Sequence, residues 1–265
     1  MTHRPRKRFA QHFLAPAWAD KVVAAIAPKR SDRFLEIGPG PGILTLRLAP
    51  RVESLIAIEI DRDLAASLRP ELPANASIVE GDVLKLDLSL FLSQGPLRVA
   101  GNLPYNISSP ILFRLLSTAR QSPLLIDATV MLQLEVADRL VARPGTKDYG
   151  VLTILASTQA DVTRLLTLPP GAFRPAPKVH SAVVRLTFKP SVVEPGIAGV
   201  FEAMVKTMFM QRRKTLANAL RPYADSVGIQ PVHALTDAGI DPSRRPETLT
   251  QPELLQLAQR LKPKA

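Results

Sequence analysis

A glycine-rich segment with the pattern Glu36-x-Gly38-x-Gly40-x-Gly42 follows the short apolar run Phe34–Ile37. Glycines let a backbone pass close to a ligand, and the helix expected over 43–49 would begin with free N–H groups. A dinucleotide-binding loop needs G-x-G-x-x-G, but Ile43 stands where its third glycine would be. The spacing favours S-adenosylmethionine instead, with Gly38 and Gly40 as cofactor-binding residues, although this motif alone is weakly specific.

Two carboxylates stand at the ends of the next two expected strands. Glu59 belongs to the apolar run 55–60 and could accept hydrogen bonds from both hydroxyls of a ribose. Asp82 follows the run 76–79 and could accept one from an adenine amino group. Each acid alone could be an ordinary surface or turn residue, and we expect the nearby Asp61 to be the N-cap of a helix. Their joint occurrence predicts one cofactor pocket, because open α/β sheets bind ligands at this edge.

A fourth strand end carries Asn102-Leu103-Pro104-Tyr105, which resembles the Asn/Asp-Pro-Pro-Tyr-type motif of methyltransferases that act on exocyclic amino groups. Adenine N6 is a poor nucleophile because its lone pair is delocalised into the ring. If the Asn102 side-chain oxygen and the Leu103 carbonyl accept its two N–H bonds, the nitrogen is drawn toward tetrahedral geometry. Pro104 fixes the turn without an N–H, and Tyr105 offers a face on which an extruded base can stack. The alternative is a tight strand-to-helix turn with a packed tyrosine.

The segment 102–111 resembles the small-subunit (16S) rRNA adenine-N6,N6-dimethyltransferases. Four other segments agree with that family and extend the resemblance to about residues 8–261: Arg8–Leu14, Phe173–Val184, Phe209–Leu220 and Gly239–Glu247. The resemblance implies transfer of methyl groups from S-adenosyl-L-methionine to N6 of two adjacent adenosines in the 3′-terminal hairpin loop of 16S rRNA. The product would be N6,N6-dimethyladenosine, formed during small-subunit biogenesis.

Three further residues receive expected roles. Phe173, on a loop that contains four prolines, is our candidate for the second face of a base-stacking site. His12 and Leu14, together with Asn102, are expected to bind the cofactor. The family usually has Asn at the position of His12, and a histidine ring nitrogen could still donate a hydrogen bond there.

Strand and helix patterns alternate from about residue 16 to 141, which predicts parallel βαβ units in an α/β sheet of the Rossmann-like, class I methyltransferase type. The alternating runs Val162–Leu168 and Ser181–Phe188 suit an antiparallel pair at the sheet edge. Helical patterns alone follow, at about 197–221, 232–238 and 252–261. We therefore predict a catalytic domain over 1–190, with a basic N-terminal arm, and an all-α rRNA-binding domain over 195–265.

The net charge of +11 predicts a polyanionic partner. The excess lies at the two ends, since residues 1–30 carry +6 and 151–265 carry +7, while 31–100 carry −3. Arg212, Arg213 and Lys214, with Arg174 and Lys178, are the expected RNA-binding residues. Lys206 and Arg213 would share one face of a helix, although most such charge runs are solvated helix faces.

The absence of cysteine excludes disulfides, thiolate nucleophiles and Cys-ligated metals. No metal site and no membrane span are expected, and we predict a cytoplasmic monomer. The nearest alternative function is the related large-subunit rRNA dimethylase. A non-catalytic ribosome-assembly or nucleic-acid-binding factor and a DNA adenine methylase are weaker alternatives.

Overall fold

A computed structural model of the chain describes residues 12–262 and divides it into two compact units. The first unit contains the chain up to Ala137 and then Ala160–Pro190. The second contains Asp138–Gln159 and the chain from Ser191 onward. The chain thus leaves the first unit, contributes a short piece to the second, and returns before it leaves again.

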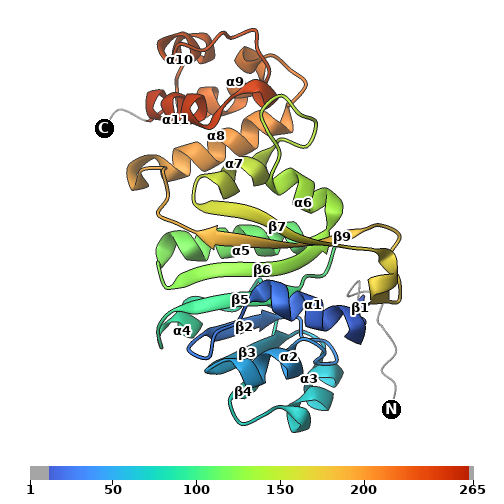
Figure 1. Cartoon of the computed structure of the whole chain (residues 1–265). Coiled ribbons are helices and arrows are strands. Elements are labelled where there is room, and N and C mark those ends of the chain that lie inside the picture. Colours follow the sequence, from blue (N-terminus) through green and yellow to red (C-terminus); the bar gives the residue numbers. More distant parts are fainter. Residues whose placement is uncertain (1–11, 263–265) are drawn as a thin grey trace. The chain divides into compact units, whose positions relative to one another are not determined.

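A mostly parallel sheet forms the centre of the first unit (Figure 1). Within the described residues it has seven strands in the order β4-β3-β2-β5-β6-β9-β7. The first four neighbouring pairs in this order, from β4 to β6, are parallel. The last two pairs, β6 with β9 and β9 with β7, are antiparallel. The strands are β2 (Arg33–Ile37), β3 (Ser54–Glu59), β4 (Ala76–Glu80), β5 (Leu97–Asn102), β6 (Leu125–Gln133), β7 (Ala160–Leu168) and β9 (Ser181–Phe188).

Helices cover this sheet because each presents an apolar face to it. The helix α1 buries Ala19, Val22, Val23 and Ile26 at the spacing of helical turns. Figure 1 shows α1, α2 and α3 together on one face and α5 behind the strands. The Asp61 side chain accepts a hydrogen bond from the N–H of Asp63, so it is the N-cap of α3 as expected. These helices are α1 (Pro16–Ile26), α2 (Thr45–Leu48), α3 (Arg62–Leu68), α4 (Ser89–Leu92) and α5 (Ser108–Gln121).

A small second sheet joins two segments that lie far apart in the sequence. The strand β1 (Phe13–Leu14) pairs antiparallel with β8 (Phe173–Arg174), and Leu14 is opposite Phe173. The N–H of Ala15 also donates to the carbonyl of Ala172 at 2.8 Å. This pairing fixes the segment that precedes α1 to the loop between β7 and β9.

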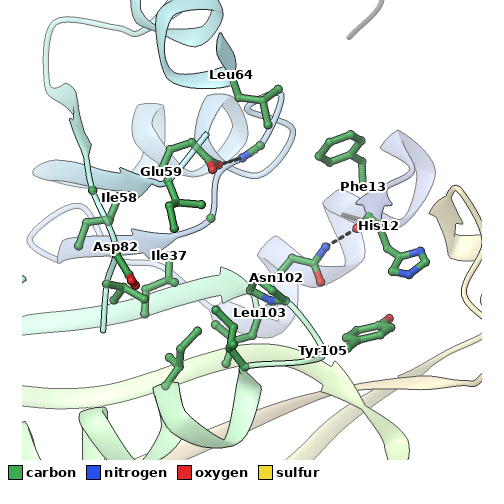
Figure 2. A pocket seen from close by; sticks show the side chains of 18 residues that line it. His12, Phe13, Ile37, Ile58, Glu59, Leu64, Asp82, Asn102, Leu103 and Tyr105 are labelled. Carbon is green, nitrogen blue, oxygen red and sulfur yellow. Dashed lines mark hydrogen bonds between the residues drawn. The ribbon is translucent and has the colours of Figure 1, made fainter. Parts of the chain in front are cut away.

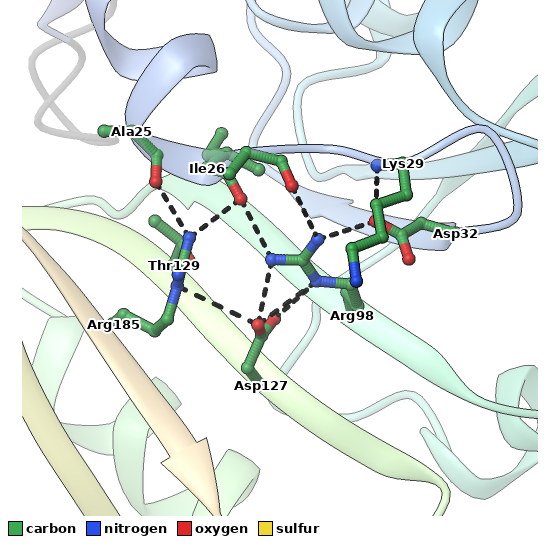
Figure 3. A network of polar contacts seen from close by, with 9 residues as sticks. Ala25, Ile26, Lys29, Asp32, Arg98, Asp127, Thr129 and Arg185 are labelled. Carbon is green, nitrogen blue, oxygen red and sulfur yellow. Dashed lines mark hydrogen bonds and ion pairs between the residues drawn. The ribbon is translucent and has the colours of Figure 1, made fainter.

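A polar network ties the C-terminal end of α1 to the sheet (Figure 3). Arg98 on β5 contacts Asp32 at 2.6 Å and Asp127 on β6 at 2.9 Å. Arg98 and Arg185 both donate to the carbonyl of Ile26, at 3.0 and 2.8 Å. A helix C-terminus carries partial negative charge, so two guanidinium groups satisfy its free carbonyls and stabilise it. The network therefore holds one end of α1 while β1 and β8 hold the other.

The second unit is mainly helical. Tyr149 helps to bring its two sequence segments together, because its hydroxyl donates to the carbonyl of Leu249 at 2.8 Å and its ring meets Phe209 edge-on. Thr250 and Glu253 form a capping box at the start of the last helix. The helices are α7 (Val151–Ser157), α8 (Ala198–Met210), α9 (Leu216–Ser226), α10 (Pro231–Asp237) and α11 (Gln251–Arg260), while α6 (Leu134–Leu140) spans the sequence boundary between the units.

The predicted α/β class is confirmed, with its mostly parallel sheet, its antiparallel edge pair and its helical C-terminal part. Two details differ from the sequence prediction. The second unit also includes Asp138–Gln159, which the pattern had grouped with the sheet. The single helical stretch expected over 197–221 is two helices, because α8 ends at Met210 and α9 begins at Leu216. Among residues 12–262, no helix is long and apolar enough to span a membrane.

Candidate active site

A pocket of about 700 Å³, including the part open to solvent, lies at the carboxyl ends of the parallel strands of the first unit. Strand ends β2, β3 and β5 and the turn after β4 all contribute to it, as parallel topology requires. Figure 2 shows Glu59 and Asp82 toward one end and His12 and Tyr105 toward the other. The lining residues are His12, Phe13, Ile37, Gly38, Gly40, Ile58, Glu59, Ile60, Leu64, Gly81, Asp82, Val83, Asn102, Leu103, Pro104, Tyr105, Ile107 and Ile111.

The glycine loop and Glu59 are joined at the first end. One oxygen of Glu59 accepts the N–H of Gly40 at 3.0 Å, and the other accepts the N–H of Asp61 at 2.9 Å. Gly40 has φ +56°, and a Cβ there would meet the Phe13 ring at 3.0 Å. Glycine is therefore needed both for the backbone conformation and for space. Each Glu59 oxygen keeps a further lone pair for a ligand hydroxyl.

The wall of this end is apolar apart from its two acids. Asp82 accepts the N–H of Leu84 at 3.0 Å, so it is a turn residue and a pocket residue at once. Sequence reasoning missed Ile60 and Val83, which directly follow Glu59 and the Asp82 turn position. Ile60 is 44% exposed although it is a large apolar residue at a strand end. That combination is a usable signal, since exposed isoleucine at such an edge often faces a flat apolar ligand.

Asn102 stands where the two ends of the pocket meet. Its side-chain nitrogen donates to the carbonyl of His12 at 2.6 Å. Its side-chain oxygen is buried and has no hydrogen-bond partner among residues 12–262. A buried acceptor without a partner costs free energy, on the order of 1–3 kcal/mol. This oxygen is therefore a natural contact for an N–H of a bound ligand.

The turn after Asn102 is fixed by the backbone. The N–H of Leu103 donates to the carbonyl of Met131 at 3.0 Å, and Pro104 follows without an N–H. The Tyr105 hydroxyl and the Ser181 hydroxyl are 2.5 Å apart and share a hydrogen bond. Burial raises the pKa of Tyr105, so its ring carries a neutral hydroxyl at neutral pH. The predicted residues 102–105 thus all line the pocket with restrained geometry.

Glu36 lies behind the glycine loop and is 1% exposed. One of its carboxylate oxygens has no hydrogen-bond partner in the described part of the chain. Burial raises the pKa of Glu36 to about 8, and the nearby Glu59 carboxylate adds to this shift. Glu36 also lines a smaller cavity that shares Gly38 and Asn102 with the main pocket. The folded protein therefore favours a neutral Glu36 near neutral pH.

Two predicted site residues are buried. Phe173 is 0% exposed and packs in the core, so its ring offers no face to a base in this structure. Leu14 is 6% exposed and packs in the same core, but it also lines the smaller cavity beside Gly38 and Asn102, and its cofactor role stays a prediction. Both follow from the β1–β8 pairing, because successive side chains of a strand point to opposite sides. Phe13 lines the pocket instead of Leu14, and sequence reasoning missed it.

His12 lines the pocket at the same end as Tyr105, away from Glu59 (Figure 2). Its ring stacks on the Tyr105 ring, with centroids 5.2 Å apart and planes 22° apart. Its Nδ1 donates to the carbonyl of Pro175 at 2.7 Å. The ring is therefore engaged with the Tyr105 end of the pocket, and only its main chain contacts Asn102.

The predicted RNA-binding residues have different environments. Arg174 and Lys178 are exposed in the first unit, where Arg174 ends β8 and Lys178 lies between β8 and β9. Arg213 and Lys214 are exposed in the turn between α8 and α9 of the second unit, so Arg213 does not share a helical face with Lys206 as expected. Arg212 is tied to its own unit, because it donates to the carbonyl of Thr146 at 3.0 Å and lies 3.6 Å from Glu247. The N-terminal arm predicted over Arg4–Arg8 falls outside the described residues.

Residues 2–262 match the family model of ribosomal RNA adenine dimethylase. The chain belongs to this family. A relative named ribosomal RNA small subunit methyltransferase A, from Syntrophotalea carbinolica, is 45% identical, and the match covers 99% of each chain. The crystal structure of a dimethyladenosine transferase from Plasmodium falciparum has a TM-score of 0.75 and 28% identity, and the match covers 93% of this chain and 96% of that one.

A second solved structure is that of the 23S rRNA methyltransferase ErmE. It has a TM-score of 0.64 and 27% identity, and the match covers 97% of this chain and 98% of that one. The chain is thus similar to methyltransferases named for both ribosomal subunits. Its family membership makes it a methyltransferase.

Proposed function

We propose that this chain transfers methyl groups from S-adenosyl-L-methionine to N6 of two adjacent adenosines in the 3′-terminal hairpin loop of 16S rRNA. The product is N6,N6-dimethyladenosine, made during small-subunit biogenesis. The observation that carries the proposal is the Asn102 oxygen, a buried acceptor without a partner among residues 12–262, which lies where the Glu59 end and the Tyr105 end of the pocket meet. Membership in the ribosomal RNA adenine dimethylase family supports it.

The chain's residues fit the cofactor. The Glu59 carboxylate is oriented by two backbone N–H groups and can accept from ribose hydroxyls. Asp82 can accept from the adenine amino group, and Ile60 and Val83 provide apolar contacts for the adenine ring. Gly38 and Gly40 leave the close backbone approach that the rest of the molecule needs. When bound, S-adenosylmethionine supplies an activated methyl group on a positively charged sulfur.

The Tyr105 end of the pocket, next to Asn102, would hold the target adenine of the RNA. The Asn102 oxygen and the Leu103 carbonyl accept the N6 hydrogens and draw the nitrogen toward tetrahedral geometry, which frees its lone pair. Tyr105 stacks on the base, and such contacts contribute about 1–3 kcal/mol. The rate enhancement comes mainly from positioning. Each transfer releases one proton, and the methylated nitrogen is acidic enough to need no strong base.

One observation favours the small-subunit rRNA over the large-subunit rRNA. The relative named for the small subunit is 45% identical along the whole chain, whereas ErmE is 27% identical. The proposal keeps the cytoplasmic location predicted from the sequence, because ribosomal subunits are assembled in the cytoplasm. It also keeps the predicted monomeric state.

The test is the partition of labelled methyl groups between the two ribosomal subunits. Purified protein is incubated with radiolabelled S-adenosylmethionine and with small and large subunits from a strain that lacks both modifications. We expect the label in small-subunit RNA, and a loss of it with Asn102→Ala. Label in large-subunit RNA would assign the alternative substrate. Binding to small subunits without label would favour a non-catalytic assembly factor.

A further inference from the structure

The Tyr105 ring is held by its edge. Its hydroxyl shares a hydrogen bond with Ser181, which is 0% exposed at the start of β9. Ser181 in turn is fixed by strand pairing with Gln133 and Leu168. The hydroxyl end of the Tyr105 ring is thus anchored to the sheet. A base that stacks on Tyr105 must therefore come to the ring, since the ring is not free to follow the base.

The His12 ring already covers one face of Tyr105. The centroid distance of 5.2 Å and the 22° angle are those of a single stacked pair. A base between the two rings would need roughly twice that separation. In Figure 2 the Asn102 amide and the His12 ring lie on the same side of the Tyr105 ring. The covered face is therefore the one from which a base can reach the free Asn102 oxygen.

The contacts of His12 allow its ring to leave while its backbone stays. The backbone carbonyl of His12 holds the Asn102 nitrogen, and β1 begins at the next residue. The ring itself is held by the stack and by one hydrogen bond, to the carbonyl of the exposed Pro175. Rotation about the side-chain torsions would uncover Tyr105 without releasing Asn102. The ring is a flat five-membered imidazole, like the smaller of the two fused rings of adenine.

We propose that the His12 ring is a place-holder for the target base: it covers the Tyr105 face that adenine must take, and adenine displaces it on entry. This inference rests on the proposed function only for the identity of the base. His12 is a positioning residue, because it acts through Tyr105 and Asn102. Its ring keeps the apolar face of Tyr105 covered. A ligand must stack on Tyr105 more strongly than the His12 ring in order to displace it, so weakly stacking ligands are excluded.

The direct test follows the His12 ring signal by NMR in protein saturated with S-adenosylhomocysteine, which blocks adenine binding at the cofactor end. The chain has four histidines, so His12→Asn assigns the signal. We expect an upfield ring-current shift that disappears in Tyr105→Leu. Added adenosine should move the wild-type signal toward the position of a free imidazole, whereas ribose 5-phosphate should not. A His12 signal that stays upfield while adenosine binds would overturn the proposal.

A kinetic test separates the place-holder from a ring that helps to bind the base. His12→Ala should lower the half-saturating concentration of unmodified small subunits by roughly two- to tenfold, the range that one aromatic contact contributes. Its Kd for S-adenosylmethionine should stay unchanged. His12→Asn removes the ring but keeps a donor for the carbonyl of Pro175. If His12→Ala folds poorly, His12→Asn takes its place in the test, and the same decrease in half-saturating concentration is expected. A raised half-saturating concentration in both variants would contradict displacement.

The two hypotheses fail in different ways. Wild-type protein that leaves small subunits unmethylated would reject the proposed function. The NMR experiment would still report on His12, because adenosine itself is the probe and no methyl transfer is needed. Conversely, normal methylation with an adenosine-insensitive His12 signal would reject the place-holder alone.

Discussion

The two polar atoms of the Asn102 side chain have opposite roles. The nitrogen is held at 2.6 Å by the carbonyl of His12, and this bond fixes which way the amide faces. The oxygen is left buried without a partner in the described residues. The protein thus holds an unsatisfied acceptor at a defined place, where it is available to accept a hydrogen bond from a ligand.

Replacing Asn102 should separate chemistry from cofactor binding. Asn102→Ala removes the acceptor for N6, and we expect methyl transfer to fall by on the order of 10²–10³, as for other preorganised polar groups. The Kd for S-adenosylmethionine, measured by calorimetry, should change by no more than a few fold, because Glu59 and the glycine loop remain. Turnover close to that of the wild type would remove Asn102 from the chemistry.

Glu36 should make the stability of the protein depend on pH. Its pKa in the folded protein is about 8, above the ordinary value of 4.5, so the folded state keeps a proton that the unfolded state releases. Stability therefore falls as pH rises through this window. Glu36→Gln does not titrate at this position. Between about pH 5 and about pH 8, its free energy of unfolding should therefore rise relative to that of the wild type by on the order of a few kcal/mol.

Urea unfolding of the ligand-free protein at a series of pH values measures this difference. The raised pKa of Glu59, which also comes from burial, acts in the same direction in both proteins, so only the electrostatic coupling between Glu59 and Glu36 differs between them. Parallel stability curves for Glu36→Gln and the wild type would show that Glu36 is already ionised in the folded protein.

Residue spacing was enough to predict that Gly38, Gly40, Glu59, Asp82 and Asn102 meet at one edge of the sheet. Each follows a strand, and parallel strands end together. Their roles stay proposals. Spacing could not predict that Phe173 and Leu14 are buried, because this depends on the β1–β8 pairing between segments about 160 residues apart. It also could not reveal that the His12 ring would lie on Tyr105.

At the scale of elements, the site depends on how firmly α1 and the sheet are joined. The strand β1 supplies His12's neighbours and leads directly into α1. The far end of α1 is held by Arg98 and Arg185, which both reach the carbonyl of Ile26. Asp127 organises the two guanidinium groups, at 2.9 and 3.9 Å. The network lies well outside the pocket, so its effect on the site is through position.

Removal of Asp127 should be costly. Its side chain is 9% exposed and that of Arg98 is 11% exposed, so Asp127→Ala leaves a nearly buried guanidinium with fewer partners. We expect a loss of about 3 kcal/mol in the free energy of unfolding. The matched control is Asp161→Ala, which breaks the pair with Lys189 where Asp161 is 72% exposed. That change should cost less than about 1 kcal/mol.

Urea titrations of the two variants give these values directly. An Asp127→Ala protein as stable as Asp161→Ala would mean that Asp32 and the carbonyls of Ala25 and Ile26 are enough to satisfy the two arginines.

At the scale of the whole molecule, the +11 charge divides between the chain's ends. The segment 31–100, which carries the glycine loop, Glu59 and Asp82, has a net charge of −3. The basic excess is thus separate from the proposed cofactor site. Within the second unit, the turn between α8 and α9 exposes Arg213 and Lys214, whereas Arg212 is committed to Thr146 and Glu247.

This difference predicts two kinds of effect in one short segment. Arg213→Ala with Lys214→Ala should weaken RNA binding and lower the slope of log Kd against log salt by roughly one to two, with no loss of stability. Arg212→Ala should instead lower the stability of the protein, because it leaves two backbone carbonyls and Glu247 without a partner cation. Filter binding over a salt titration, with thermal unfolding alongside, separates the two. An unchanged salt slope in the double variant would exclude this turn as an RNA contact.

The fold class was predictable because strand and helix patterns alternate so regularly from residue 16 to 141. The boundary between the units was not. The piece Asp138–Gln159 reads as a continuation of that alternation, yet it joins the second unit through Tyr149 and its contacts with Leu249 and Phe209. Such an excursion leaves no mark in local sequence, because only contacts with residues about 100 positions away define it.

If this pocket dimethylates two adjacent adenosines of small-subunit RNA, the products must appear in its 3′-terminal fragment. Mass spectrometry of that fragment detects them after incubation of unmodified small subunits with the protein and S-adenosylmethionine. We expect N6,N6-dimethyladenosine at two neighbouring positions of the hairpin loop, and unmodified adenosines when Asn102→Ala replaces the wild type. Dimethyladenosine elsewhere, or the same product from Asn102→Ala, would contradict this function.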